Sequence, residues 1–252
     1  MKFIECLQGS DEWHQARSGL ITASMFSEVI YEVGGLDEKQ QAYVDAVKSG
    51  LAPKEAAAAA GYKALPTSSL VAKALNGEKT SDYSDGAKRY ASDLAIERIS
   101  GKVYGIPPKA WILNRGHEME AHARRIYEGK SGAFVTEAGI CVDDNKMGYS
   151  TDGLVDDEGL IEIKSPIDSI KIETMMRTGD VSEYIHQMQG GMWLTGRKWC
   201  DFIMYVPDLE SVGNDLYVKR IMRDDAFIDA MVEKLFEFSK LIDSKELFFR
   251  SK

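Results

Sequence analysis

The stretch YSTDGLVDDEGLIEIKSP, residues 149–166, decides how the fold is interpreted. It holds two short apolar segments separated by the acidic turn DDEG, a pattern that predicts a β-hairpin. Side chains alternate along a strand, so Glu162 and Lys164 are expected on one face and Ile161 and Ile163 on the other. Charges on the inner face of a sheet cost on the order of several kcal/mol to bury unless they are paired or bound to a metal.

Further oxygen-bearing side chains lie on either side of this hairpin in the sequence. Asp152 ends the preceding strand and is expected to meet Glu162 across the turn, while Glu120 and Gln187 lie in the helical segments before and after. A Glu-Ile-Lys triplet alone is most often a plain ion pair on a solvated strand. The added oxygen ligands favour a Mg²⁺ site for phosphodiester hydrolysis, in which Lys164 activates water or neutralises phosphate charge.

Composition sets limits on the class of protein. The 252 residues suffice for one large domain, and their 44% hydrophobic and 28% charged content is ordinary for a soluble protein. Three widely spaced cysteines and the lack of a long apolar run predict a cytoplasmic protein with no membrane segment. The net charge of −9 disfavours a nucleic-acid partner but does not exclude one, since basic groups can line a single groove.

The periodicity predicts helices over most of residues 11–132, with EVGGLDE as loop and one helix running from Ser81 towards Ile99. Short strands follow between residues 133 and 166 as a three-strand meander, then a helix near 182–196. Two strands near 199–225 and a final helix over 226–242 complete the pattern. The order predicts an α/β fold with a central mixed sheet flanked by helices.

Four sequence blocks resemble a known nuclease family. Asp152–x9–Glu162–Ile–Lys164 resembles the PD-(D/E)xK motif, with Thr151 where that motif often has proline. Together, the blocks EWHQARSGLITAS, RGHEMEAHARRIYE, YSTDGLVDDEGLIEIKSP and YIHQMQGGMWLTGRK resemble the YqaJ-type viral recombinase family of λ exonuclease-like enzymes. The resemblance implies a restriction-endonuclease-like core within a single domain over residues 1–252.

The resemblance also implies an activity and a set of roles. The activity is 5′-to-3′ digestion of one strand of linear duplex DNA, which leaves 3′ single strands for an annealing protein in phage or prophage recombination. Metal ligands carried over are Asp152, Glu162, the Ile163 carbonyl and Glu120, around two Mg²⁺ ions that Mn²⁺ can replace. The resemblance implies that Lys164 and Gln187 are catalytic groups. It implies that the terminal 5′ phosphate is bound by Arg17, Ser24 and Ser150. The family further implies a homo-oligomeric ring of three subunits in the bacterial cytoplasm.

The physical chemistry of the last group agrees with that role. Arg17 offers a planar fork of donors, and Ser24 is expected in the first turn of a helix capped by Thr22, where free amides attract anions. The simpler alternatives are a surface cation for Arg17 and an ordinary helix start for Ser24.

Residues 37–80 exceed what the family pattern requires. They resemble the helix-turn-helix of phage terminase small subunits, with a Gly turn, an Ala-rich helix and the tripeptide AGY. Between Ala46 and Asn76 there are four lysines and one glutamate, a net charge of +3. This local positive charge, within a chain of net negative charge, is suited to contact phosphates. An equal alternative is a small helical insert that packs on the core or on another subunit.

Two other functions remain open at this point. One is a PD-(D/E)xK endonuclease of restriction or resolvase type, which would cut closed circular DNA. The other is a DNA-binding module with an inactive nuclease core, which the presence of Glu120, Asp152, Glu162 and Lys164 disfavours.

Overall fold

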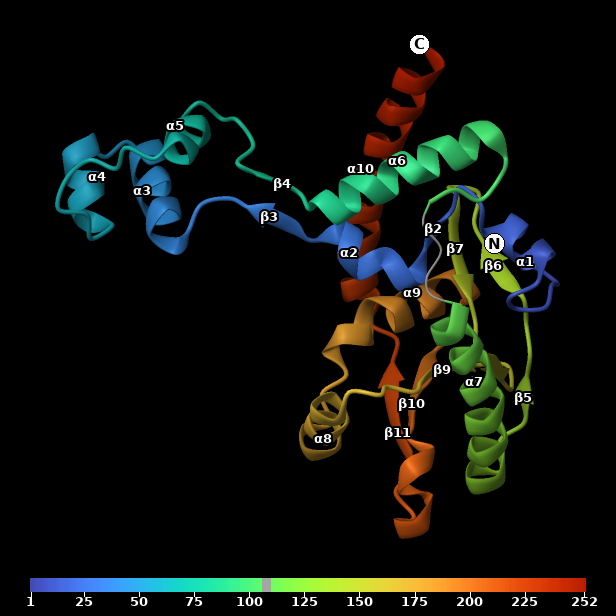
Figure 1. Cartoon of the computed structure of the whole chain (residues 1–252). Helices are drawn as coiled ribbons and strands as arrows, with labels where there is room; N and C mark the ends of the chain where they lie inside the picture. Colours follow the sequence, from blue (N-terminus) through green and yellow to red (C-terminus); the bar gives the residue numbers. More distant parts are fainter. Residues whose placement is uncertain (106–109) are drawn as a thin grey trace. The chain divides into compact units, whose positions relative to one another are not determined.

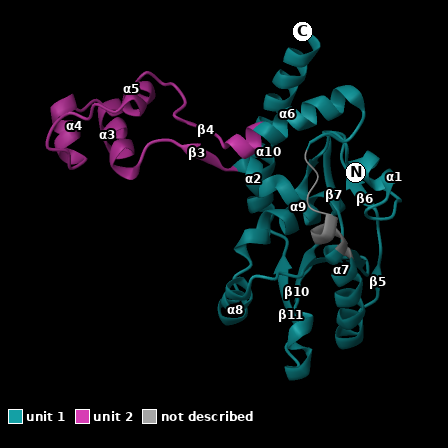
Figure 2. Ribbon diagram, viewed as in Figure 1, with its two compact units in different colours: residues 1–30, 89–252 teal, residues 31–88 magenta. Residues whose placement is uncertain are grey.

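The computed structural model describes residues 1–105 and 110–252, with the backbone alone for residues 110–114 and 117. The chain divides into two compact units, residues 1–30 with 89–252 and residues 31–88 (Figure 2). We call them unit 1 and unit 2. Unit 1 combines helices with mixed sheets, so the expected α/β class is confirmed at that level.

Unit 1 contains two sheets, with strand orders β1-β6-β7-β2 and β11-β10-β9-β8-β5. The parallel pairs are β2 with β7 and β9 with β10, and the others are antiparallel. The bounds of the nine strands are β1 (Lys2–Ile4), β2 (Ile21–Thr22), β5 (Val135–Thr136), β6 (Ile140–Val142), β7 (Met147–Ser150), β8 (Gly153–Val155), β9 (Gly159–Lys164), β10 (Trp199–Tyr205) and β11 (Leu216–Met222).

The predicted single sheet and three-strand meander are therefore wrong in one respect, because the chain changes sheets between β7 and β8. The Thr151 Oγ1 accepts a hydrogen bond from the Gly153 amide and donates one to the Gly153 carbonyl, both at 3.0 Å. Such local side-chain bonds compete with a strand ladder. Asp152 therefore lies in a break between two sheets.

Helices cover both faces of the five-stranded sheet. On one face α7 packs against β9, β10 and β11, while α9 contacts β9 and β10 as well as β6 and β7 (Figure 1). In the described part of unit 1 the helices and 3-10 segments are α1 (Asp11–Arg17), η1 (Ala23–Met25), α2 (Phe26–Ile30), α7 (Ala110–Ser131), α8 (Ser169–Thr178), η2 (Ser182–Tyr184), α9 (Ile185–Thr195), η3 (Pro207–Val212) and α10 (Asp225–Arg250). Helix α6 (Asp85–Ser100) begins in unit 2 and continues into unit 1.

Close approach explains two glycines inside α9. A Cβ atom at Gly190 would lie 2.6 Å from the Phe26 ring, and one at Gly191 would lie 2.7 Å from the Tyr149 ring. Glycine weakens a helix interior by about 1 kcal/mol relative to alanine. Here it allows α9 to pack directly on the strand that leads to Asp152.

Unit 2 has a core of its own, formed by α3 (Glu38–Lys48), α4 (Pro53–Ala59) and α5 (Ser69–Leu75). All three helices lie where the sequence pattern predicts helix. Two other predictions fail: Glu32–Gly34, expected as loop, is strand β3, and the helix expected from Ser81 begins only at Asp85. The strand β4 (Ser81–Tyr83) pairs antiparallel with β3 instead.

Among the described residues, no helix is both long enough and apolar enough to cross a lipid bilayer.

Candidate active site

Strand β9 places its side chains on two chemically different faces. Ile161 and Ile163 pack into an apolar cluster with Ala123 and Tyr127 of α7. Glu162 points to the other face and is fully buried, with 0% of its surface exposed. The expected alternation is confirmed, and it leaves a carboxylate inside the protein.

Two groups contact the Glu162 carboxylate. The Tyr149 hydroxyl donates a hydrogen bond to Oε2 at 3.1 Å, and the Lys164 ammonium lies 2.7 Å from Oε1. The Lys164 contact is an ion pair, and beyond it Oε1 has no hydrogen-bond partner among the described residues. A buried carboxylate oxygen whose described partner is a cation is suited to bind a metal cation as well.

Asp152 reaches the same strand from the break between the sheets. Its Oδ2 atom accepts a hydrogen bond from the Ile163 amide at 2.7 Å. In a strand the N–H and C=O of one residue point to the same side, so the Ile163 carbonyl faces this edge too. Burial, then the charges of Glu162 and Glu120, raises the pKa of Asp152 well above its usual range. The three carboxylates therefore share one electrostatic site.

The same carboxylates stabilise the charged form of Lys164. Burial lowers the pKa of Lys164, but the carboxylates of Glu162 and Asp152 raise it by more, and the net pKa is raised. The side chain is 29% exposed and its ammonium lies 5.5 Å from the centre of the Tyr184 ring. Lys164 is thus a cation that is held between buried carboxylates and solvent.

Two cavities open this site to a substrate. One, of about 420 Å³, is lined by Arg115, Glu120, Ile163 and Lys164. The other, of about 600 Å³, is lined by Glu120, Arg124, Glu137 and Thr151 among others. Glu120 lines both, so a ligand in either cavity lies beside the helix residue predicted to bind the second metal ion.

The donor set fits a hard divalent cation. Within residues 1–105 and 110–252, no three His, Cys, Asp or Glu side chains are already clustered to bind a metal by themselves. Mg²⁺ needs fewer protein ligands, because it retains several waters. Asp152, the buried Glu162 carboxylate and the Ile163 carbonyl supply such a partial set, beside which Glu120 adds a fourth oxygen group.

The two glutamines of α9 have different surroundings. Gln187 lies half-buried in the first turn. Gln189 is structural, since it donates to the Met222 carbonyl at 2.9 Å and accepts from the Asp224 amide at 3.0 Å.

Trp13, which the sequence analysis did not select as a site residue, contacts two of the predicted phosphate ligands. Trp13 donates to the Ser150 Oγ at 2.6 Å, and the Arg17 guanidinium lies 4.2 Å from the centre of the Trp13 ring. Burial is the main cause of the lowered pKa of Arg17, so the cation is partly desolvated. Trp13 therefore fixes both Arg17 and Ser150.

Ser24 lies in a neighbouring polar group. Its hydroxyl is 3.3 Å from that of Thr22, which lies 3.4 Å from the Tyr90 hydroxyl. The Thr22 side chain makes no capping hydrogen bond, and the turn that follows is a 3-10 segment rather than the expected α-helix. The Tyr90 hydroxyl also acts electrostatically on Arg17, so the two polar groups adjoin.

Three residues near these sites were missed by the sequence reasoning. Tyr149 contacts the Glu162 carboxylate, Trp13 contacts the predicted phosphate ligands Ser150 and Arg17, and Glu97 accepts a hydrogen bond from the Gly19 amide at 2.7 Å. Of these three residues, only Tyr149 and Trp13 could have been found from residue type, because a buried Tyr hydroxyl or Trp N–H needs a polar partner. Glu97 lies in a helix with no motif.

Similarity to known proteins agrees with this geometry. LHK-Exo, an alkaline exonuclease from Laribacter hongkongensis, is 28% identical over 96% of this chain and 97% of its own, with a TM-score of 0.65. A phage-related exonuclease from Haemophilus somnus 129PT shares the fold at 17% identity, a TM-score of 0.58, and coverage of 92% of this chain and 96% of its own. A comparison with curated proteins finds no significant match. The family model of the YqaJ-like viral recombinase domain matches residues 58–198, more than half of the chain, and the protein belongs to that family.

Proposed function

We propose that this protein is a Mg²⁺-dependent exonuclease that digests one strand of linear double-stranded DNA from its 5′ end. The observation that carries the proposal is the convergence of Asp152, Glu162 and Lys164 at the end of β9 beside a cavity lined by Glu120. Similarity to LHK-Exo supports it, as does the structure of that enzyme in complex with dAMP, a deoxynucleotide, at 29% identity and a TM-score of 0.63.

The carboxylates and one carbonyl hold the metal in this proposal. Asp152, Glu162 and the Ile163 carbonyl bind the first Mg²⁺, Glu120 lies at the second, and Mn²⁺ can substitute. When bound, such ions polarise the phosphate and lower the pKa of a water molecule.

Lys164 acts on the substrate side of these ligands. Because its pKa is raised, Lys164 is protonated in the metal-free protein. It is therefore suited to orient the attacking water and to neutralise a phosphate oxygen. Removal of a proton by Lys164 requires that the neighbouring carboxylate charge first be neutralised. Gln187 supports the site from the first turn of α9.

Direction of digestion depends on recognition of the end. Arg17, Ser24 and Ser150 bind the terminal 5′ phosphate in this proposal. A guanidinium that is held over a Trp ring and partly desolvated forms stronger charge-assisted bonds than a solvated one. The 3′ single strands that remain are the substrate of a single-strand annealing partner, and the active form is a homo-oligomer, a ring of three subunits.

One digestion experiment tests the proposal. Linear duplexes with 5′-phosphate or 5′-hydroxyl ends, and a covalently closed circle, are incubated with Mg²⁺, Mn²⁺ or EDTA. We expect metal-dependent loss of linear DNA, a faster rate on 5′-phosphate ends, and an intact circle. Cleavage of the circle identifies an endonuclease instead, and no digestion in Mg²⁺ or Mn²⁺ identifies an inactive DNA-binding module.

The assembly is tested separately. Light scattering after size-exclusion chromatography is expected to give three times the mass of the 28.1 kDa chain. A monomeric protein that still digests processively would contradict the ring.

A further inference from the structure

Unit 2 has a charge distribution that the nuclease chemistry does not require. From Ala46 to Asn76 it carries four lysines and a single acid, Glu55, within a chain of net charge −9. All four lysines, at positions 48, 54, 63 and 73, are exposed. We propose that this segment binds duplex DNA through its phosphate backbone, away from the DNA end.

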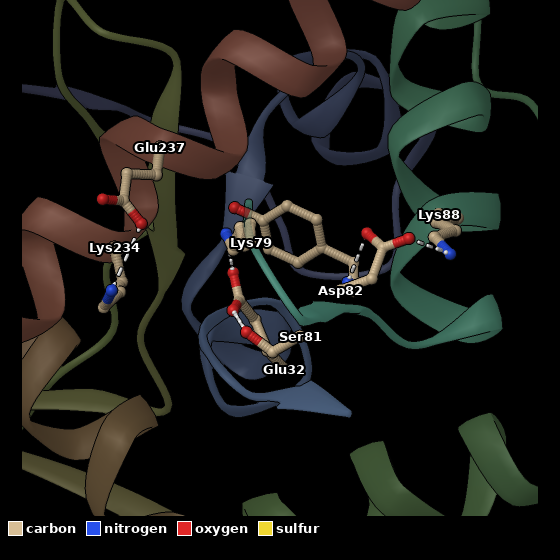
Figure 3. A network of polar contacts seen from close by, with 8 residues as sticks. Glu32, Lys79, Ser81, Asp82, Lys88, Lys234 and Glu237 are labelled. Atoms are coloured by element: carbon tan, nitrogen blue, oxygen red, sulfur yellow. Dashed lines mark hydrogen bonds and ion pairs between the residues drawn. The ribbon is translucent and has the colours of Figure 1, made fainter. Parts of the chain in front are cut away.

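Two acids of unit 2 form ion pairs with lysines outside residues 46–76. Glu32 pairs with Lys79 and accepts a hydrogen bond from Ser81, and Asp82 lies 2.7 Å from the Lys88 ammonium (Figure 3). These contacts lie on and next to the β3–β4 ribbon. The whole unit has seven lysines and eight acids over residues 31–88. Its acids, except Glu55, lie outside residues 46–76, so the unit is polarised along its sequence.

Two acids of α3 also serve local structure. Asp37 caps the helix by accepting from the Gln40 amide at 2.7 Å, and Asp45 accepts from the Gln41 side chain at 2.7 Å. By contrast, none of the four lysines forms an ion pair with any residue that the structure describes. Four exposed cations without internal partners remain available to phosphates.

The core of unit 2 does not depend on these lysines. Tyr43, Val44 and Val71 pack with the small residues Ala56, Ala57 and Ala74. The exposed positions of the short helices α4 and α5 include Ala58, Ala59, Ser69 and Ala72. Small side chains let a helix approach a DNA backbone closely while flanking lysines reach the phosphates.

Backbone geometry keeps the first two helices close together. Residues 49–52 join α3 to α4, and Gly50 has a φ of +100° with open space where a Cβ would lie. A short turn with glycine is typical of helix-turn-helix units. Residues 60–68 between α4 and α5 form a longer connection than that motif has. The prediction is therefore limited to backbone binding without base readout.

Binding to DNA without ends isolates this surface from the nuclease site. The probe is a 30-base-pair duplex closed by a hairpin at each end, with full-length protein in EDTA and fluorescence anisotropy as the readout. Four phosphate contacts contribute about 3.6 to the slope of log affinity against log salt. We expect the variant K48Q/K54Q/K63Q/K73Q to lose this contribution and to bind at least tenfold more weakly at 150 mM salt.

A second variant controls for net charge. K234Q/K240Q/K245Q/K252Q removes the same charge from α10 and the residue that ends the chain, and it should bind the closed duplex as wild type does. Circular dichroism melting checks that both variants remain folded. The proposal is overturned if wild type does not bind the closed duplex, or if the two variants bind it equally.

The alternative role of unit 2, packing against a second copy of the chain, gives a different result. In that case the Lys48, Lys54, Lys63 and Lys73 substitutions change the mass in light scattering and leave closed-duplex binding intact, which also overturns the proposal. The exonuclease proposal is judged on linear DNA with Mg²⁺, so either can fail while the other stands.

Discussion

Substitution of Asp152 by asparagine separates the structural role of this residue from its role in metal binding. In the wild type, Asp152 Oδ2 accepts a hydrogen bond from the Ile163 amide at 2.7 Å. Asparagine has the same shape and keeps an oxygen that can accept this bond. The bond changes from charge-assisted to neutral, which costs about 1 kcal/mol. Removing a buried negative charge next to Glu162 and Glu120 offsets this cost. We expect the metal-free free energy of unfolding to change by less than about 1 kcal/mol at pH 7.

The pH dependence follows from the direction of the pKa shift. The folded pKa of Asp152 is raised, so the stability it contributes is full below its unfolded pKa and is lost as pH rises through the folded pKa. Asp152→Asn removes this loss. The variant is therefore expected to gain stability relative to metal-free wild type as the pH rises through the folded pKa of Asp152.

Metal binding reverses the comparison. A ligand present at 100 times its dissociation constant stabilises the native state by about 2.7 kcal/mol. For a protein of this size that corresponds to a rise in Tm of roughly 5–11 °C. Wild type should show this rise with Mg²⁺, and more strongly at higher pH, because the pKa of Asp152 is raised and binding displaces its proton. Asp152→Asn should show almost none, with digestion at least 100-fold slower.

Differential scanning fluorimetry with and without Mg²⁺, together with release of labelled nucleotides from linear DNA, measures both effects. Asp157→Asn is the matched control, an exposed carboxylate in the turn of the same hairpin, and it should behave as wild type. An Asp152→Asn protein that keeps the full Mg²⁺ shift in Tm refutes the assignment of Asp152 as a ligand.

Three further substitutions test the neighbouring residues. Lys164→Ala should nearly abolish digestion while keeping the Mg²⁺ shift in Tm, and a rate within about threefold of wild type, under roughly 0.7 kcal/mol of barrier, would show that Lys164 is not catalytic. Tyr149→Phe removes the 3.1 Å bond to Glu162 and should lower the free energy of unfolding by about 1.5–3 kcal/mol, measured by urea unfolding; an unchanged midpoint would contradict the contact. Arg17→Ala should slow digestion of 5′-phosphate ends and hardly change the rate on 5′-hydroxyl ends, whereas an equal loss on both would mean that Arg17 does not read the phosphate.

The sequence was sufficient to predict the faces of β9. Alternation alone separates Ile161 and Ile163 from Glu162, and the apolar partners of the isoleucines confirm that separation. Helix ends also depend on local signals, as at Ser10, whose side chain accepts a hydrogen bond from the Trp13 amide at 3.2 Å. Such features depend on neighbours within a few residues.

Strand pairing between segments far apart in the sequence was not predictable from local sequence signals. Glu32–Gly34 ends in a glycine that precedes Gly35 and was expected as loop, but it forms a strand that pairs with Ser81–Tyr83. Helix α8 carries a clear cap, since Asp168 accepts from the Ile170 and Lys171 amides. It was missed, although both this cap and the amphipathic pattern of residues 169–178 can be read from the sequence.

The break between the two sheets explains why the carboxylates gather where they do. Had β7 continued into β8 in one sheet, Asp152 would be a ladder residue whose side chain pointed to one face. The Thr151 bonds to Gly153 interrupt the ladder, and Asp152 turns back to the Ile163 amide. This places its carboxylate beside those of Glu162 and Glu120, while the Lys164 ammonium pairs with Glu162. A divalent cation that binds these oxygens would offset their mutual repulsion, which links the affinity for metal to the geometry of a single interrupted strand.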